Sequence, residues 1–512
     1  MMVEKRVLIA TLLSVLFLSV YSRQLAKRYP ALHQTKAVPK TVSVVDTQTA
    51  PTQAKLLEHE ETATIESSSL VFEIGKQTGN LHSVVLRHFK SNAAGEAIRF
   101  SHNFPIFSVT PSSESASVSR FTAQGNSAAI DFTTQGGAAY RVMYELSEQN
   151  PMATVTVQTP ASAKPFTGDF VITTSWLRGD DLSNRQNRLE SFAVVQPDKD
   201  KRKYSHTVFP LRKEKIVPRG TFLFSLSERY FVQTVRLNKA AEEGVILTSH
   251  EGSALARLSV GSAQADTPLA FVYFGPRDYF QMRKAGFAEA LPIGMLGQIG
   301  LMLLLVLSWL ASITHNYGIA VILFSVLITC TMAPFTLIGF RSMKKMQALK
   351  PKIDKIMADN KNNPTKANQE VLALYREHKI SPLGGCLPML LQMPIFIALF
   401  QAISHFIDLR GQTFLWIKDL SLPDHVFHLS FSLPILGDYL NALPAIMALA
   451  MYLQTRASQR MSGTSNDPTT QMMSGPMMPI LFFVMFYHFP SGLVLYWLTN
   501  SLSSMVWYRL AK

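Results

Sequence analysis

The sequence predicts a polytopic α-helical membrane protein with an all-β domain outside the membrane. Charged residues make up only 16% of the 512-residue chain, whereas about 25% is typical of soluble domains. The hydrophobic content of 47% is ordinary, so the missing charge must be concentrated in long uncharged stretches. The residues that follow the first such stretch show the short alternating runs of β-strands. A net charge of +14 further suggests an anionic partner, either nucleic acid or a lipid surface.

Residues 1–23 have the basic start and apolar centre of a secretory signal. No A-x-A-like cleavage site follows, so we expect an uncleaved signal-anchor helix, with a cleaved signal as the alternative. Residues 24–62 are rich in Thr, Gln, Ala, Pro and Lys, which predicts a flexible linker. Residues 63–285 are predicted to be a β-sandwich, because alternating runs such as 153–157 are separated by turns rich in Gly and Asn.

The later uncharged stretches predict the remaining spans, since about 20 apolar residues cross a bilayer. They cover 290–340, 382–407, 440–455 and 468–508, and the first and last are divided by turn residues at 314–318 and 489–492. Residues 341–382 carry ten Lys or Arg against four acids, which places them in the cytoplasm. A cytoplasmic N-terminus then leaves one crossing between the β domain and this segment. We therefore predict an interfacial amphipathic helix at 286–315.

Six spans with both termini in the cytoplasm satisfy the charge distribution. After the signal anchor they are predicted at 316–340, 383–407, 437–455, 476–490 and 491–508, joined by a cytoplasmic helical hairpin at 341–382, an external loop at 408–436 and a cytoplasmic loop at 456–475.

The cytoplasmic hairpin is predicted to be amphipathic. Apolar residues recur at three- and four-residue spacing from Met343 to Met357, and Asn363 followed by Pro364 predicts the start of the second helix. The basic side chains form a candidate docking surface for the ribosome, RNA, anionic lipid or a partner protein: Lys344, Lys345, Lys352, Lys355 and Arg376. The alternative is that they only solvate the hairpin and fix its orientation.

Polar residues within spans are costly and are therefore candidates for function. Each lies four residues from a second polar or aromatic residue on the same side of its helix: Ser325 with Thr329, Gln392 with the aromatic Phe396, and Tyr496 with Asn500. If these sides converge, the bundle contains a polar slot; the alternative is interhelical hydrogen bonding that holds the helices together. Pro334, Pro394 and Pro490 also lie at membrane depth and predict bent helices.

Signatures of common enzyme classes are absent, including H-E-x-x-H, G-x-S-x-G, the P-loop and G-x-G-x-x-G. The 13 histidines show no metal-ligand spacing, and we expect no enzymatic activity, metal or cofactor. A transporter or channel is the alternative class, which would favour inverted repeats and charged sites at the midplane. A membrane-anchored scaffold is a third possibility.

Two long motifs resemble the YidC/Oxa/Alb family of membrane protein insertases. The segment SPLGGCLPMLLQMPIF at 381–396 is similar to the third-span signature of its bacterial YidC members, and FPSGLVLYW at 489–497 to their last hairpin. The segment LKPKI at 349–353 resembles the start of their cytoplasmic hairpin. The resemblance is strong from about residue 290 to 510 and weaker over the β domain.

The resemblance implies a five-helix insertase core and a periplasmic β-supersandwich, in the inner membrane of a Gram-negative bacterium. It implies a monomer that inserts and folds newly synthesised membrane proteins, alone or with the Sec translocon and the ribosome, without a cofactor or a specific nucleic acid sequence. Substrate would enter a hydrophilic groove open to cytoplasm and lipid. Motif position assigns substrate contact to Ser325, Gln392, Phe396, Tyr496 and Trp497.

One departure from the family pattern concerns the second span. Family members typically place an arginine a few residues before its proline, and aligning Asn316-Tyr317-Gly318 and Met332-Ala333-Pro334 puts Thr329 there. We hypothesise that hydration of the groove by Ser325, Thr329 and Gln392 takes the place of that charge.

Overall fold

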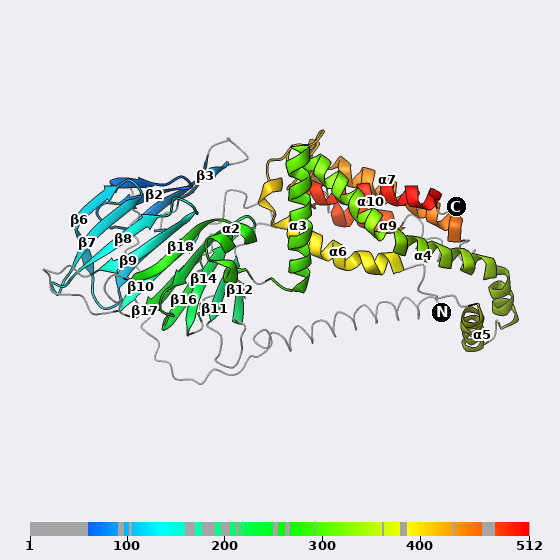
Figure 1. Ribbon diagram of the computed structural model, residues 1–512, viewed down its shortest axis with the longest axis horizontal. Coiled ribbons are helices and arrows are strands. Elements are labelled where there is room, and N and C mark those ends of the chain that lie inside the picture. Colours follow the sequence, from blue (N-terminus) through cyan, green and yellow to red (C-terminus); the bar gives the residue numbers. More distant parts are fainter. Residues whose placement is uncertain are drawn as a thin grey trace. The chain divides into compact units, whose positions relative to one another are not determined.

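The computed structural model describes residues 60–90, 97–101, 105–158, 169–176, 190–195, 205–210, 215–217, 219–248, 254–261, 267–291, 293–360, 363–378, 387–433, 436–462 and 477–510. The predicted signal anchor and nearly all of the predicted linker lie outside these residues. The chain divides into two compact units, residues 1–292 and 293–512. The first is rich in strands and the second in helices (Figure 1).

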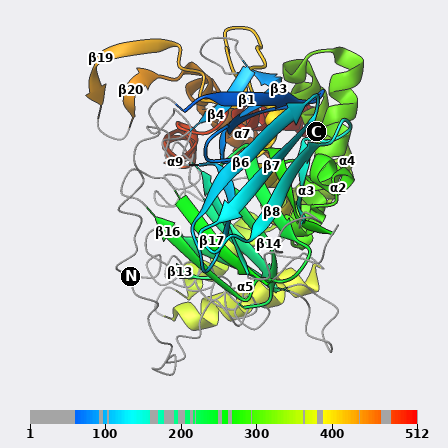
Figure 2. The ribbon, with the colours of Figure 1, turned by 90° about the vertical axis from the view of Figure 1, so that its left-hand side faces the viewer.

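The first unit contains two nine-stranded sheets (Figure 2). One has the order β1 (Thr62–Glu66), β2 (Leu70–Gly75), β3 (Leu81–Lys90), β5 (Phe107–Pro111), β10 (Phe170–Trp176), β17 (Ala254–Val260), β16 (Glu243–Thr248) and β13 (Lys215–Ile216), with β4 (Ala97–Ser101) also paired to β3. The other has the order β12 (Ser205–Pro210), β11 (Glu190–Val195), β14 (Thr221–Ser227), β15 (Phe231–Leu237), β18 (Pro268–Pro276), β9 (Met152–Gln158), β8 (Ala139–Leu146), β7 (Ser127–Thr134) and β6 (Ala116–Gln124).

The two sheets share a core because alternate side chains of each strand point to one face. Strand β9 alternates as its sequence predicts, with Ala153, Val155 and Val157 buried. Aromatic rings join the sheets: Phe72 on β2 meets Phe274 on β18 edge-on at 5.5 Å between ring centroids, and Phe107 on β5 meets Tyr144 on β8 at 6.4 Å. After β18, the short helices α2 (Tyr279–Lys284) and η3 (Ala288–Ala290) end the unit.

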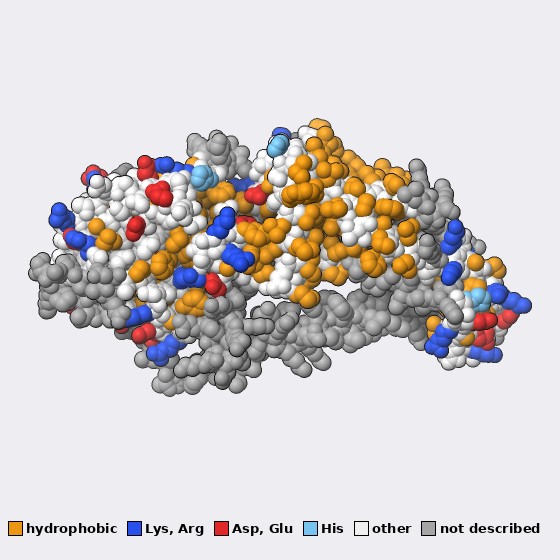
Figure 3. All heavy atoms as spheres, viewed as in Figure 1, with side chains coloured by type: hydrophobic (Ala, Val, Ile, Leu, Met, Phe, Trp, Pro, Cys, Tyr) orange, Lys and Arg blue, Asp and Glu red, His pale blue; other side chains and the backbone are white. Residues whose placement is uncertain are grey.

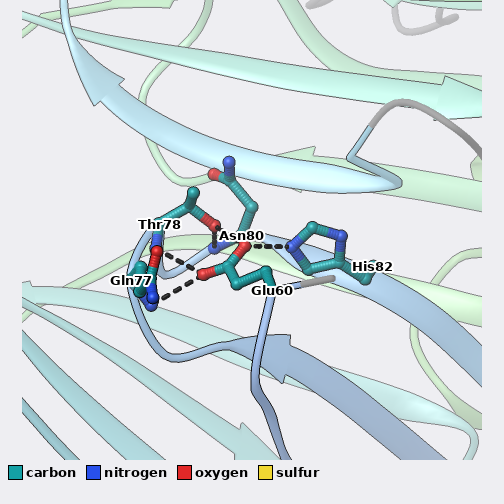
Figure 4. A network of polar contacts seen from close by, with 5 residues as sticks. All are labelled: Glu60, Gln77, Thr78, Asn80 and His82. Atoms are coloured by element: carbon teal, nitrogen blue, oxygen red, sulfur yellow. Dashed lines mark hydrogen bonds and ion pairs between the residues drawn. The ribbon is translucent and has the colours of Figure 1, made fainter. Parts of the chain in front are cut away.

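A buried carboxylate fixes the segment that enters this unit to the turn between β2 and β3 (Figure 4). Glu60 Oε1 accepts hydrogen bonds from the backbone N–H groups of Gln77 and Thr78 at 2.6 and 2.7 Å. Its Oε2 accepts from the Thr78 hydroxyl at 2.9 Å and lies 2.9 Å from Nε2 of His82. The turn itself needs Gly79, whose φ of 68° is unfavourable for other residues.

The second unit is a helical bundle. It comprises α3 (Met295–Thr314), α4 (Tyr317–Asp359), α5 (Pro364–Glu377), α6 (Leu387–Ser404), η4 (Ile407–Leu409), the strands β19 (Phe427–Leu433) and β20 (Gly437–Leu440), α7 (Ala442–Ser462), α9 (Met477–Phe486) and α10 (Ser491–Leu510). The break predicted at 314–318 is confirmed: His315 adopts a left-handed conformation, and the Asn316 side chain caps α4 by accepting from the backbone N–H of Ile319 at 3.1 Å.

Three elements differ from their predicted form. Helix α4 runs without interruption from the predicted span at 316–340 into the first arm of the predicted hairpin. Residues 437–440 form β20, which pairs with β19, so the helix predicted from residue 437 begins at Ala442. Pro490 lies between α9 and α10 and bends no helix, whereas Pro334 and Pro394 do lie inside α4 and α6. A proline fits before a helix because its missing N–H would find no partner there.

Helix α3 packs closely on α6 through small residues. A Cβ atom added at Gly300 would lie 2.9 Å from the carbonyl oxygen of Ala398 and 3.1 Å from Cβ of Ala402. The opposite face of α3 is also apolar, with Met302, Leu305 and Trp309 exposed, whereas an amphipathic surface helix would carry polar residues there. Among the described helices, α3 and α4 are long and apolar enough to cross a membrane.

Removing the buried carboxylate should destabilise the strand-rich unit. We expect Glu60→Ala to lower its free energy of unfolding by about 2 kcal/mol, because buried donors lose a charged acceptor. The measurement is urea unfolding of the full chain in detergent, followed by the β-sheet circular dichroism signal. Glu61→Ala is the matched control, since the side chain of Glu61 is 75% exposed and that of Glu60 only 4%. Equal losses in the two variants would contradict a specific role for Glu60.

Candidate functional site

Helix α10 joins the polar positions of α4 and α6. Thr329 on α4 is buried, and its Oγ1 lies 3.0 Å from Oδ1 of Asn500 on α10. The same hydroxyl lies 2.7 Å from the carbonyl oxygen of Ser325. Because a hydroxyl has one hydrogen, it can satisfy only one of these two acceptors fully at a time. The α4–α10 contact is therefore able to exchange partners at little cost.

A second polar contact joins α6 to α10. Gln392 Nε2 donates to the hydroxyl oxygen of Tyr496 at 2.6 Å, and the Tyr496 side chain is fully buried. The ring of Tyr496 also contacts Phe324 of α4, at 6.1 Å between centroids. The contact thus lies among side chains of three helices, where an unpaired hydroxyl or amide would cost free energy.

An aromatic cluster lies beside these polar contacts. Phe396 on α6 meets Trp497 on α10 edge-on at 4.9 Å, and Trp497 also contacts Phe482 and Phe486 of α9 at 5.2 and 5.4 Å. These rings offer a smooth apolar surface whose edges tolerate polar neighbours. The cluster brings α6, α9 and α10 together next to the Gln392–Tyr496 hydrogen bond.

The structure therefore connects the predicted site residues in three contacts, Thr329–Asn500, Gln392–Tyr496 and Phe396–Trp497. Ser325 is buried beside them, but its hydroxyl donates to the Val321 carbonyl oxygen of its own helix at 2.6 Å and reaches no other helix in the described part of the chain. Both interhelical hydrogen bonds fit the alternative that polar residues hold the helices together, and they also place exchangeable donors and acceptors in one region. Within the described ranges, no group of three or more His, Cys, Asp or Glu residues is placed to hold a metal ion.

Sequence reasoning missed a second set of polar residues, where α9 ends and α10 begins. Asp424 is buried and accepts from Trp416 Nε1 at 3.2 Å and from the backbone N–H groups of Ala442 and Leu443 at 3.0 and 2.9 Å. Asn441 is buried as well, and its Nδ2 donates to the Tyr487 carbonyl oxygen at 2.8 Å. The position of Asn441, directly before an apolar run, was the available signal for a helix start.

These bonds fix the loop before β19 to the beginning of α7 and the end of α9. The turn before α10 is fixed to the same loop, since the backbone N–H groups of Ser491 and Gly492 donate to the carbonyl oxygens of Leu422 and Leu420, each at 2.8 Å.

The turn between α4 and α5, in the basic hairpin, has the form that the sequence predicts. Asn363 caps α5 by accepting from the backbone N–H of Lys366 at 3.1 Å, and Pro364 is the first helical residue. Asn360 Nδ2 donates to Glu370 Oε2 at 3.0 Å and joins α4 to α5. The five predicted docking side chains are all exposed: Lys344, Lys345, Lys352, Lys355 and Arg376.

The helical unit is similar to a described family and to named proteins. Residues 309–511 match the family described as 60Kd inner membrane protein. A protein named membrane protein insertase YidC from Endomicrobium trichonymphae is 40% identical over 46% of this chain and 44% of its own length. A protein of the same name from Geobacter metallireducens is 27% identical over 98% of this chain and 97% of its own. In the first of these alignments the chain spans less than half of its relative.

Among solved structures, an active YidC insertase aligns with 88% of this chain and 93% of its own at 19% identity. The TM-score of this alignment is 0.38.

A double-mutant cycle should detect the α6–α10 hydrogen bond. We expect Gln392→Leu and Tyr496→Phe to show a coupling free energy of about 1 kcal/mol, as for other interhelical hydrogen bonds in membrane proteins. Unfolding by SDS in mixed micelles provides the measurement. Thr331→Val combined with Tyr496→Phe is the control, because the Thr331 hydroxyl bonds only its own helix among the described residues, at Leu327. A coupling equal to that of the control would mean that the bond does not form.

Proposed function

With the resemblance to the YidC family confirmed by these matches, we propose that the chain is a membrane protein insertase. It accepts newly synthesised membrane proteins and assists their entry into the inner membrane and their folding. The observation that carries this proposal is the meeting of two interhelical polar contacts with an aromatic cluster along α10. The transporter or channel reading would need a charged site, and every site residue here is uncharged.

The proposed mechanism uses a hydrophilic groove between α4, α6 and α10. Thr329, Asn500, Gln392 and Tyr496 exchange their mutual hydrogen bonds for bonds to water and to the polar flank of an incoming helix. Water at this depth shortens the apolar barrier that a polar segment crosses, and the cost of a charge falls with that thickness. Phe396 and Trp497 contact the apolar part of the substrate while it moves into lipid. Ser325 contributes its hydroxyl, which exchanges its bond to the Val321 carbonyl for one to water, and its carbonyl competes for the Thr329 hydroxyl.

The absence of a groove arginine is a specific feature of this proposal. No Lys or Arg occurs between Lys284 and Arg341, so an acidic substrate segment meets no fixed positive charge on the first half of α4. Hydration and neutral hydrogen-bond donors then stabilise that segment in transit. A neutral groove also discriminates less strongly against basic segments than one that contains an arginine would.

The surroundings of the groove follow the topology predicted from charge. Both termini lie in the cytoplasm, and the β unit and residues 408–436 lie in the periplasm. The protein works as a monomer, alone or with the Sec translocon, and the ribosome delivers the substrate. The exposed lysines of α4 carry the contact with the ribosome, whose RNA is a dense anion.

Insertion by the purified protein tests the groove. The native chain in liposomes should protect from protease the short acidic exported tail of a ribosome-synthesised single-span substrate. The combined change Ser325→Ala, Thr329→Val and Gln392→Leu should reduce protection roughly tenfold, because the groove no longer holds water. Thermal stability of each variant in detergent distinguishes loss of function from loss of fold.

Two further variants sharpen this experiment. Thr331→Val makes the same chemical change two residues away on an exposed part of α4 and should leave insertion unchanged. Thr329→Arg supplies the charge found in relatives. Protection with Thr329→Arg but none with the native chain would mean that a neutral groove does not serve this substrate, and full activity of the triple variant would overturn the hydration mechanism.

Charge on the α4–α5 hairpin should control docking of translating ribosomes. Changing Lys344, Lys345, Lys352 and Lys355 together to Gln should weaken binding of ribosome–nascent chain complexes to proteoliposomes roughly tenfold at low salt, with a smaller loss as salt rises. The same four positions changed to Arg keep the charge and form the control. Equal binding of the Gln and Arg variants in cosedimentation would show that the lysines only solvate the hairpin.

A further inference from the structure

An exposed aromatic hairpin leads into α7. Strands β19 and β20 pair with each other only, among the strands described (Figure 2). The side chains of Phe427 and Phe431 are 66% and 62% exposed, and Tyr439 and Leu440 are exposed as well. Large apolar side chains gathered on an exposed element indicate a surface that something covers.

A tight turn adds two more apolar side chains to this surface. The backbone of Phe414 and Ile417 exchanges two hydrogen bonds, of 2.9 and 2.8 Å, and the turn between them displays Leu415 and Trp416. Leu415 is 76% exposed and has a φ of 51°, an unfavourable conformation for a residue that buries nothing. The bond from Trp416 Nε1 to buried Asp424 holds the turn beside the base of the hairpin.

The chemistry of the surface favours lipid over an ionic partner. From residue 425 to 440 the chain contains no Lys or Arg and one acid, Asp438. Two Ser, one Pro, one Gly and two His accompany aromatic and aliphatic residues there, and aromatic side chains with polar neighbours are typical of the level where headgroups meet acyl chains. An outer apolar stripe on α7, formed by Ile446, Leu449 and Leu453, continues from Leu440 in the same segment. If α7 crosses the bilayer, the hairpin reaches the membrane surface at the end of that stripe.

We propose that the β19–β20 hairpin and the Leu415–Trp416 turn are an interfacial anchor, which inserts its aromatic side chains between the lipid headgroups of the outer leaflet. The proposal rests on the membrane placement given under the proposed function. Asp424 transmits the anchor's position to the bundle, because its carboxylate holds both Trp416 and the first backbone N–H groups of α7. The anchor thereby sets the depth at which α7 begins.

Fluorescence quenching by lipid-bound nitroxides tests this position. A bimane label is attached at Phe431→Cys in the full-length chain, in which Cys330 and Cys386 are changed to Ser, and the protein is reconstituted in phosphatidylcholine–phosphatidylglycerol liposomes. We expect a nitroxide near the headgroups to quench the label roughly twofold more than one near the chain ends, and iodide in the lumen or outside to quench it weakly. Strong quenching by iodide with none by either lipid, or stronger quenching from the chain ends, would overturn the proposal.

Labels elsewhere separate this inference from the proposed function. A label at Leu449→Cys on α7 should be quenched by the deeper nitroxide, and a label at Leu372→Cys, an exposed apolar residue of α5, should be open to iodide. If the label at position 449 is not reached by lipid, the membrane placement of α7 fails. If lipid nitroxides quench the label at position 449 while iodide quenches the label at position 431 strongly, α7 lies in the membrane and only the proposal of an interfacial anchor is contradicted. Phe427→Ser should increase iodide quenching at position 431 roughly twofold.

Discussion

A polar group removed from water must find a partner, and the helical unit is organised by this constraint. In the apolar bundle, the Thr329 hydroxyl pairs with Asn500 and the Gln392 amide with Tyr496. Rotation of α6 or α10 would separate the Gln392 amide from the Tyr496 hydroxyl in a buried region, whereas the Thr329 hydroxyl can also bond the Ser325 carbonyl of its own helix. Both pairs use α10, so this helix contacts α4 and α6 through polar groups. The rings of Phe396 and Trp497 pack edge-on beside these bonds, at 4.9 Å between centroids.

The same constraint acts differently at the second set of buried polar residues. Near the start of α7 and α10, Asp424 and Asn441 accept and donate bonds of 2.8 to 3.0 Å to backbone groups. The N–H groups that Asp424 accepts from are the first of α7 and have no acceptor within their own helix, so the carboxylate serves to cap that helix. The Thr329 and Gln392 contacts join side chains only, and side chains can change partners by rotating about single bonds. A site that must admit a polar segment belongs where the bonds are of this second kind.

The strand-rich unit satisfies a buried charge in a comparable way. Glu60 accepts hydrogen bonds from two backbone N–H groups and from one hydroxyl, and it also contacts His82. Both oxygens of this carboxylate, which is almost inaccessible to water, therefore have polar partners. These bonds hold the entry of the unit to the β2–β3 turn, next to the point where the predicted linker ends.

The sequence by itself determined the succession of a strand-rich and a helical unit, and it singled out most residues of the candidate site. Uncharged stretches, basic segments and alternating runs are local patterns, and local physics is enough to interpret them: the breaks at 314–318 and 489–492 and the cap at Asn363 all appear in the structure. Motif resemblance added Trp497. Spacing within one helix could show that two residues share a side, but it could not show which helix they meet.

Tertiary structure decided the pairings and the exceptions. That Thr329 meets Asn500, that residues 437–440 form a strand, and that Asp424 caps a helix 18 residues later all depend on contacts between distant segments. Such contacts depend on how the helices pack. A single side chain that pairs with a distant segment produces no periodic pattern in the sequence, so the sequence does not reveal its partner. Pro490 shows the reverse case, because its effect on a helix depends on where the preceding helix ends, which is set by packing rather than by the residue.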